Sequence, residues 1–301
     1  MKLIGELSDK LNSLPDVEFK TDVDLTKYST FKLKSFGSVA HVSSLEALQA
    51  TLKLLHHYSC PYRIVGWGAN IVLPEQPLDI LIRLDFPWAQ EDFHQAHNEY
   101  DLWASTPLNV LTSHAQKFGL KGWEVFTGVP ASLGGAIYMN AGTNLGEIGK
   151  IVKEVTIVTK NGELKIVPIG PESFSYRKNH FVEPGDIIVK AKLIHLGIDS
   201  GITDLIKKYL QMRNNTQPLS EKTCGCVFKN YSVHHRAGQM VDLMGLKGLT
   251  YHGLKVSHKH ANFFENKNEA NASDFHFLSD FIISELKLSL GIEFELEVKI
   301  D

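Results

Sequence analysis

The sequence predicts an α+β protein, in which helices and strands are mixed along the chain. Apolar residues recur at helical spacing in some segments and gather in short strand-like runs in others. Loops join most of the strand-like runs, so a doubly wound parallel sheet with regular crossover helices is not favoured. The 301 residues are enough for about two domains, and we expect a boundary near residues 197–202.

The individual elements follow from these patterns. The helical pattern covers residues 45–57, 108–118, 202–213 and 274–290. Strand-like runs cover residues 40–42, 63–65, 80–84, 152–158, 164–167, 187–196 and 292–300. Between two of these runs, Lys160-Asn161-Gly162 predicts a hairpin turn, because Asn-Gly tolerates positive φ. Ser273 is expected to cap the last helix, since its hydroxyl can accept a hydrogen bond from a first-turn N–H.

Charge and composition exclude several classes of protein. The net charge is −3, from 31 basic and 34 acidic side chains, so no global charge favours nucleic acid or an anionic membrane. No apolar run reaches the roughly 18 residues of a membrane span. Glu6, Asp9 and Lys10 interrupt the N-terminus where a signal peptide would be apolar. We therefore expect a cytoplasmic protein with no membrane insertion and no nucleic-acid partner.

The cysteines and histidines leave few metal-binding patterns. Cys60, Cys224 and Cys226 are an odd number, which argues against a disulfide framework. Cys224 and Cys226 form C-x-C, so a metal half-site and a regulatory disulfide stay open beside simple packing at Cys224. His258 and His260 have the i, i+2 spacing that would place both rings on one face of a strand. Because no motif supplies further convergent ligands, we expect no metal.

The first glycine loop covers residues 66–70 and reads GWGAN. Paired glycines let backbone N–H groups approach a phosphate without hindrance from a Cβ. The dinucleotide fingerprint would need a third glycine followed by a helix, but Ile71 begins a short apolar run. A Rossmann turn is therefore disfavoured, and a tight hairpin is the alternative to a ligand loop.

The second glycine loop is more specific, because residues 128–149 contain six glycines and almost no charge. The backbone of such a segment can pass close to a flat or anionic ligand. Close backbone packing between domains is the alternative reading.

These loops and five further motifs resemble the UDP-N-acetylenolpyruvoylglucosamine reductases (UDP-N-acetylmuramate dehydrogenases). The family pattern GxGSN is similar to residues 66–70, with Ala69 replacing serine, and GxPGxVGGAxxMNAGAYGGE is similar to residues 128–147, with Ala131 replacing glycine. The patterns YRxS, CGSxFxN, AGxLID…GLKG, VSxKHAGF and LxxEVxxxG are similar to residues 176–179, 224–230, 237–248, 256–263 and the end of the chain. The resemblance covers about residues 22–300, and the length is similar to that of the shorter family type, which lacks a tyrosine loop.

The resemblance implies a two-subdomain FAD-binding fold of the vanillyl-alcohol-oxidase/PCMH type plus a C-terminal α+β substrate-binding domain. The FAD-binding subdomains would cover residues 1–78 and 79–200, and the substrate-binding domain residues 201–301. The implied reaction passes hydride from NADPH to non-covalently bound FAD and then to UDP-N-acetylglucosamine enolpyruvate. The product, UDP-N-acetylmuramate, serves peptidoglycan synthesis. We expect a monomer whose partner is this small nucleotide sugar.

By the same resemblance, the catalytic residues are Arg177, Cys226 and Glu297. Hydride addition to an enolpyruvyl ether places negative charge beside the carboxylate, and a permanently charged fork such as Arg177 can stabilise that charge. Glu297 is expected to act beside it in a protonated or proton-sharing form. Cys226 stands where the family usually has a serine proton donor, and a thiol is the stronger acid of the two.

The implied FAD-binding residues are Gly66, Trp67, Gly68, Ala69, Asn70, Gly128, Val129, Pro130, Ser132, Gly134, Gly135, Asn140 and Gly142. Tyr176 and Asn230 are expected to contact substrate, with packing as the alternative for Tyr176. Two other functions stay open: a flavin-linked oxidoreductase of the same superfamily with another substrate, and a degenerate homologue that binds a nucleotide sugar without turnover.

Overall fold

The computed structural model describes residues 2–232 and 234–300, and the chain divides into two compact units. Unit 1 contains Met1–Thr21, Ser38–Gly66 and Asp79–Leu210. Unit 2 contains Asp22–Gly37, Trp67–Leu78 and Gln211–Asp301. Each unit has its own buried core. The finer, three-part division at residues 78 and 200 stays a prediction.

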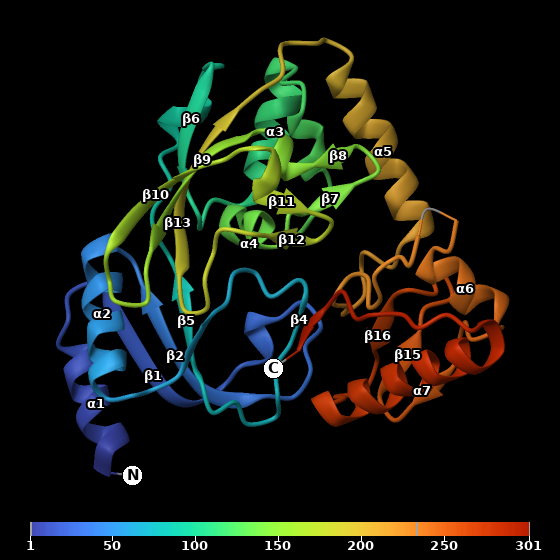
Figure 1. Ribbon diagram of the computed structural model, residues 1–301, viewed down its shortest axis with the longest axis horizontal. Helices are drawn as coiled ribbons and strands as arrows, with labels where there is room; N and C mark the ends of the chain where they lie inside the picture. Colours follow the sequence, from blue (N-terminus) through green and yellow to red (C-terminus); the bar gives the residue numbers. More distant parts are fainter. Residues whose placement is uncertain (1, 233, 301) are drawn as a thin grey trace. The chain divides into compact units, whose positions relative to one another are not determined.

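The first sheet has the strand order β1-β2-β5-β3. Its strands are β1 (Val17–Asp24), β2 (Phe36–Val42), β5 (Ile80–Leu84) and β3 (Tyr62–Ile64). β5 is parallel to both β2 and β3, and α2 (Leu45–His57) makes the crossover between those two strands. Ser44 begins α2 by accepting a hydrogen bond from Ala47 N at 3.3 Å. Helices α1 (Lys2–Asn12) and α2 lie next to each other beside β1 and β2 (Figure 1). They bury Leu7 and Leu48 in one core with Ile82 of β5.

The second sheet of unit 1 is antiparallel, in the order β10-β9-β13-β6. Its strands are β10 (Leu164–Pro168), β9 (Val152–Val158), β13 (Ile187–Ile194) and β6 (Glu99–Trp103). β9 and β10 form the hairpin that the sequence predicts, and Gly162 in its turn has φ +83°. This positive φ is the reason that the turn needs glycine.

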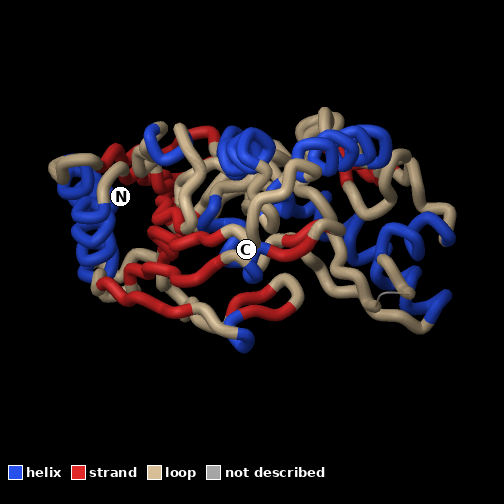
Figure 2. Tube along the Cα trace, turned by 90° about the horizontal axis from the view of Figure 1, so that it is seen from above, coloured by secondary structure: helices blue, strands red, loops and turns tan. Residues whose placement is uncertain are grey.

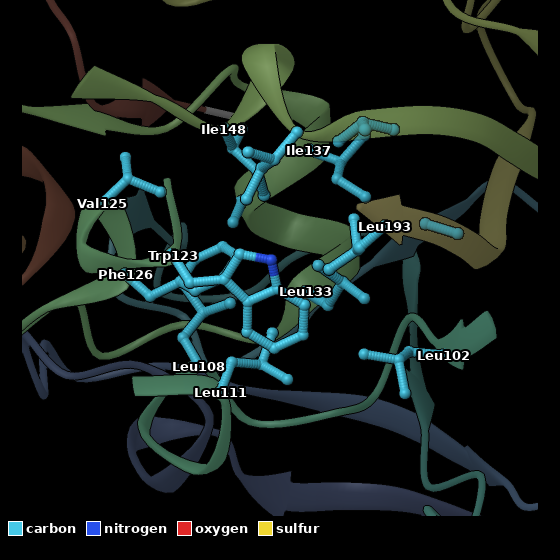
Figure 3. Packing of buried hydrophobic residues seen from close by; sticks show 14 of the residues in the cluster. Leu102, Leu108, Leu111, Trp123, Val125, Phe126, Leu133, Ile137, Ile148 and Leu193 are labelled. Atoms are coloured by element: carbon cyan, nitrogen blue, oxygen red, sulfur yellow. The ribbon is translucent and has the colours of Figure 1, made fainter. Parts of the chain in front are cut away.

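Trp123 lies in the core beside this sheet and the helices α3 (Leu108–Phe118) and α4 (Leu133–Tyr138). Its side chain is fully buried, and its indole N–H donates to Ile194 O at 2.8 Å, which supplies the partner that a buried indole needs. Leu108, Leu111 and Leu133 pack around the ring (Figure 3). This packing fixes α4, the helix within the second glycine loop.

Short elements complete unit 1. β7 (Gly142–Thr143) pairs with β8 (Gly146–Glu147), and β11 (Phe174–Ser175) pairs with β12 (Lys178–Asn179). The 3-10 helices are η2 (Glu91–Phe93), η3 (Trp123–Phe126), η4 (Ile148–Lys150) and η5 (Pro171–Ser173). α5 (Ile202–Thr216) begins in unit 1 and ends in unit 2.

Unit 2 contains a three-stranded antiparallel sheet of β14 (Thr250–Tyr251), β15 (Leu254–Val256) and β16 (Phe264–Asn266). Its helices are η1 (Thr26–Tyr28), α6 (Ala237–Leu243) and α7 (Ala272–Leu290). β4 (Ile71–Val72) pairs in parallel with β17 (Lys299–Ile300). The core combines Phe31 and Val72 from the two short N-terminal segments with Phe228, Phe264 and Phe275 from the C-terminal part.

The α+β prediction is confirmed, and Figure 2 shows helices and strands mixed along the chain. Three finer expectations are wrong. Within the described part of 292–300, the paired strand is limited to Lys299–Ile300, because the preceding residues bond to a loop. Asn271 rather than Ser273 caps α7, since its side chain accepts from the backbone N–H of Asp274. His258 and His260 lie in a loop after β15, so no strand face carries both rings.

Among the helices of residues 2–232 and 234–300, none is long and apolar enough to cross a bilayer.

Candidate active site

The two glycine loops meet within unit 1 at Gly66 and Ser132. A Cβ on Gly66 would lie 2.6 Å from Ser132 Oγ, so a larger residue cannot fit without displacing that hydroxyl. Ser132 precedes α4 and is 6% exposed, and its hydroxyl does not cap the helix. The missing Cβ at Gly66 therefore makes room for the Ser132 hydroxyl, a donor that an oxygen-rich ligand can engage.

The glycines of α4 serve two different purposes. A Cβ on Gly134 would lie 2.7 Å from Ala104 Cβ, and Gly134 N donates to Ala104 O at 2.8 Å. Close backbone packing within unit 1 therefore explains Gly134. Gly135 is exposed and lies beside Ser132, so its backbone is accessible. The turn that leads into α4 contains Gly128, Val129 and Pro130, with Gly128 at φ +70°.

Tyr176 and Arg177 form the loop of the β11–β12 hairpin. Arg177 Nη2 donates to Gly142 O at 3.0 Å, and a Cβ on Gly142 would lie 3.1 Å from Arg177 Nη1. The guanidinium carbon lies 5.2 Å from the centroid of the Tyr176 ring, a cation–π distance. Asn140 is 1% exposed, and its Nδ2 donates to Ser175 O at 3.0 Å. The catalytic arginine candidate therefore lies against the end of the second glycine loop.

Within unit 2, the last residues of the first glycine loop lie beside the segments that contain the catalytic candidates Cys226 and Glu297. Asn70 Nδ2 donates to the backbone oxygen of Glu297 at 3.2 Å. The segment that contains Cys226 runs antiparallel beside the segment that contains Glu297, and Glu297 N donates to Val227 O at 2.8 Å. Cys226 and Glu297 are both half-buried. Since β3 pairs with β5 and β4 with β17, the first glycine loop is not a hairpin.

Gly68 and Thr30 hold this loop in place. Gly68 has φ +63°, and a Cβ there would lie 1.9 Å from Tyr28 O. Thr30 N donates to Gly68 O at 3.0 Å, and Thr30 Oγ1 donates to Thr223 O at 2.7 Å. Thr30 therefore ties the glycine loop to the start of the cysteine segment at Cys224.

Asn262 is a second positioning residue that sequence analysis missed, as it missed Thr30. Its side chain is 2% exposed and brackets Phe228, because Oδ1 accepts from Phe228 N and Nδ2 donates to Phe228 O, each at 2.8 Å. The signal in the sequence was an asparagine beside the apolar pair 263–264, where an unpaired polar side chain would be costly.

The two cysteines of C-x-C have different environments. Complete burial raises the pKa of the Cys224 thiol far above its usual value. Cys224 therefore stays protonated and packs in the core of unit 2. Cys60, Cys224 and Cys226 are all free thiols.

His260 is held in a loop by a structural contact. Burial lowers the pKa of His260, and the positive charge of Lys247 lowers it further. His260 Nδ1 accepts a hydrogen bond from Asn262 N at 3.3 Å. Among the residues that the structure describes, no group of three or more His, Cys, Asp or Glu side chains is placed to hold a metal.

The remaining predicted contacts are more exposed. Asn230 Oδ1 accepts from Ala237 N at 3.0 Å, which satisfies the first turn of α6. Tyr176 is 46% exposed and Trp67 is 37% exposed, and Ala69 lies near Gly225. Ligand contacts by these residues stay predictions.

Two family profiles match the chain. "FAD binding domain" matches residues 37–167, and "UDP-N-acetylenolpyruvoylglucosamine reductase, C-terminal domain" matches residues 217–300. The UDP-N-acetylenolpyruvoylglucosamine reductase of Halalkalibacterium halodurans is 30% identical over 97% of this chain and 98% of the relative. The enzyme of the same name from Clostridioides difficile is 32% identical over 96% and 95%. The crystal structure of the Thermus caldophilus reductase matches with a TM-score of 0.77 and 29% identity, over 94% of this chain and 98% of that one.

The FAD-binding domain and the arrangement of the glycine loops define an α+β flavin-binding oxidoreductase. More particularly, the chain belongs to the UDP-N-acetylenolpyruvoylglucosamine reductase family. The FAD-binding fold with a C-terminal reductase domain, which the resemblance implied, is therefore confirmed.

Proposed function

We propose that this enzyme reduces UDP-N-acetylglucosamine enolpyruvate to UDP-N-acetylmuramate, with bound FAD and with NADPH as the hydride donor. One observation carries the proposal: the Cys226 and Glu297 segments lie side by side, next to Asn70 of the first glycine loop. An FAD-binding fold alone does not require this pair, whereas proton delivery to a carbanion does. The reaction belongs to peptidoglycan precursor synthesis. We place the enzyme in the cytoplasm as a monomer whose partner is a small nucleotide sugar.

The residues of unit 1 fit FAD. The missing Cβ at Gly66 makes room for the Ser132 hydroxyl, and the exposed backbone of Gly135 lies beside it. We assign Gly66, Ser132 and Gly135 to the anionic part of the cofactor, which N–H and O–H donors can hold. When bound, FAD relays hydride from NADPH to the vinyl group of the substrate.

Arg177 is assigned to the charge that develops on the substrate. Hydride addition leaves a carbanion next to the substrate carboxylate, and the charge spreads into an enolate. The guanidinium keeps its charge and presents a planar fork of N–H donors. Gly142 O and the Tyr176 ring hold that fork before any substrate arrives, so little reorganisation is needed as charge develops.

Cys226 is assigned as the proton donor. Its S–H bond breaks, the substrate carbanion takes the proton, and the thiolate regains a proton from solvent. Glu297 is the companion acid, and a protonated or proton-sharing form avoids repulsion of the anionic intermediate. Asn70 and Val227 fix the backbone of Glu297 at this place.

A coupled assay distinguishes the candidate functions. We expect the FAD-loaded protein to oxidise NADPH only after enolpyruvyl-UDP-N-acetylglucosamine is added, with UDP-N-acetylmuramate identified by mass spectrometry. Steady NADPH oxidation without this compound would indicate a flavin-linked oxidoreductase with another substrate. Binding without turnover would indicate a degenerate homologue. A protein that takes up no FAD contradicts the proposal.

The proton donor is tested by substitution of Cys226. In Cys226→Ala, reduction of the flavin by NADPH should be unchanged, while its reoxidation by substrate slows by about 10²-fold or more, the usual share of a general acid. Cys226→Ser restores an O–H group and should recover part of the rate. Cys60→Ala in unit 1 is the control and should match the unsubstituted enzyme. Normal turnover by Cys226→Ala would show that another group delivers the proton.

A further inference from the structure

Two residues near the end of the second glycine loop have left-handed backbone conformations although neither is glycine. Asn140 has φ +45° and Arg177 has φ +56°. Such conformations cost roughly 1–3 kcal/mol each and persist only where surrounding contacts hold them. Asn140 lies two positions after the end of α4 and is 1% exposed, whereas Arg177 lies in a hairpin loop 37 positions later in the chain. The contacts of Asn140 connect the two.

The protein itself uses most of the hydrogen-bonding capacity of Asn140. Its Nδ2 donates to Ser175 O at 3.0 Å and to Glu147 Oε2 at 3.1 Å, while its Oδ1 accepts from Gly149 N at 3.1 Å. A carboxamide has two N–H donors and two acceptor positions. Both donor contacts are therefore made within unit 1, which leaves the Asn140 side chain without a spare donor for a cofactor.

The hairpin that carries Arg177 is anchored to the segment 138–142 at three points. Asn140 holds Ser175 O, the Arg177 guanidinium holds Gly142 O at 3.0 Å, and Asn179 Nδ2 donates to Tyr138 O at 2.6 Å. The hairpin itself has two residue pairs, and a hairpin that short is not stable alone. Asn140 is the anchor that lies buried, and it holds the residue two positions before Arg177.

We propose that Asn140 is a positioning residue for Arg177 and not an FAD contact. The Asn140 amide holds Ser175 O. This contact also holds the adjoining loop, which contains Arg177 and sets the direction of its guanidinium. The inference rests on the proposed function, in which Arg177 stabilises the developing negative charge. Without the Asn140 amide, the loop relaxes toward ordinary φ values and the fork moves from its place.

Asn140→Gly tests the side chain alone, because glycine adopts φ +45° without strain. We expect reoxidation of the flavin by the enolpyruvyl substrate to slow by about 10²-fold, the scale of a misplacement near 1 Å. Flavin reduction by NADPH and the dissociation constant of FAD should be unchanged. Loss of FAD affinity with a normal reoxidation rate would overturn the inference in favour of a cofactor contact.

The double variant Asn140→Gly/Arg177→Ala shows whether Asn140 acts through Arg177. If it does, the double variant reoxidises no more slowly than Arg177→Ala alone, because the positioned group is already gone. Additive losses would overturn the inference. If Arg177→Ala itself is without effect, the proposed function of Arg177 fails; if Arg177→Ala is slow and Asn140→Gly is normal, only the present inference fails.

Two further variants separate positioning from folding. Asn140→Asp keeps the shape and the acceptor for Gly149 N but replaces the donor, so it should slow reoxidation as Asn140→Gly does. Asn12→Ala is the matched control, since Asn12 makes two bonds with the backbone of Phe19, at 2.8 and 3.2 Å, elsewhere in unit 1. It should lower the melting temperature and leave both half-reactions unchanged. A normal reoxidation rate in Asn140→Asp would also overturn the inference.

Discussion

At the scale of single residues, Gly68 shows how one missing Cβ can fix a site. Its φ of +63° disfavours other residues, and Tyr28 O occupies the place of a Cβ at 1.9 Å. Gly245 has a similar φ of +69° but open space around it. Comparing Gly68 with Gly245 therefore separates two costs of adding a Cβ: the cost of the positive φ and the cost of a clash with Tyr28 O.

We predict that Gly68→Ala lowers the free energy of unfolding by more than about 3 kcal/mol, whereas Gly245→Ala costs about 1 kcal/mol, the value for positive φ alone. Denaturant unfolding of both variants measures the difference. Equal losses in the two variants would show that the loop around Gly68 shifts freely and that the Tyr28 carbonyl does not constrain it.

The buried side chain of His114, in unit 1, makes the stability of the fold depend on pH. It is 3% exposed, its Nε2 lies 2.8 Å from the Tyr100 hydroxyl, and burial lowers its pKa to about 4. In the unfolded chain the pKa of histidine is about 6.5. Between these values the unfolded chain binds a proton that the folded chain excludes, so stability is present above about pH 6.5 and is lost as the pH falls toward 4.

This pH effect predicts that the free energy of unfolding drops between pH 7 and pH 4 by on the order of 3 kcal/mol through His114. His114→Gln should be less stable at pH 7 but should lose less on acidification. His56→Gln, on the exposed side of α2, is the control and should keep the original slope. An unchanged slope in His114→Gln would assign the acid sensitivity to other groups.

At the scale of elements, regular apolar spacing predicted the helices α2 and α3 with their observed bounds and predicted the β9–β10 hairpin. β6 was missed, although Tyr100 and Leu102 alternate with acidic residues. One face of β6 is polar, and Asp101 on that face forms an ion pair with Lys190 of the neighbouring strand β13. A strand with a charged face depends on a partner far away in the chain, so local composition alone does not reveal it.

The start of α7 shows a similar limit. Ser273 fits a cap by residue type, but the helix begins two residues earlier, where Asn271 and Asp274 form a reciprocal capping box. Each side chain accepts from the other residue's backbone N–H at 3.0 Å. The acidic residue at the third helical position was the signal for this earlier start.

We predict that Asn271→Ala destabilises the protein by about 1 kcal/mol, the usual value of an N-cap. Ser273→Ala should stay within about 0.5 kcal/mol, as for a substitution without a special contact. Thermal unfolding of the two variants compares the caps directly. A larger loss in Ser273→Ala than in Asn271→Ala would reverse the assignment.

At the scale of the whole molecule, unit 2 is assembled from three separate segments. Phe31 and Val72, from residues 22–37 and 67–78, are buried in the core of a unit whose other residues follow position 210. Asn266 Nδ2 also donates to Phe31 O at 3.1 Å and to Lys32 O at 2.8 Å. The C-terminal part therefore does not contain its complete core.

This arrangement predicts that a fragment of residues 201–301 does not fold cooperatively. Its circular dichroism in the aromatic region should be weak, and it should bind an apolar dye, because part of its core is missing. The full chain, measured in parallel, should unfold cooperatively. A sharp unfolding transition in the fragment would mean that Phe31 and Val72 are dispensable to this unit.

The sequence by itself determined the α+β class, the two glycine loops, the hairpin turn and the family, because spacing and motif order are local properties of the chain. The tertiary structure decided which residues meet. It placed Gly66 against Ser132, Asn140 beneath the Arg177 hairpin, and Asn70 against Glu297. It also explained Gly134 by packing and gave Cys224 and Cys226 different environments. These outcomes depend on burial and on contacts between distant segments, which residue type and spacing do not encode.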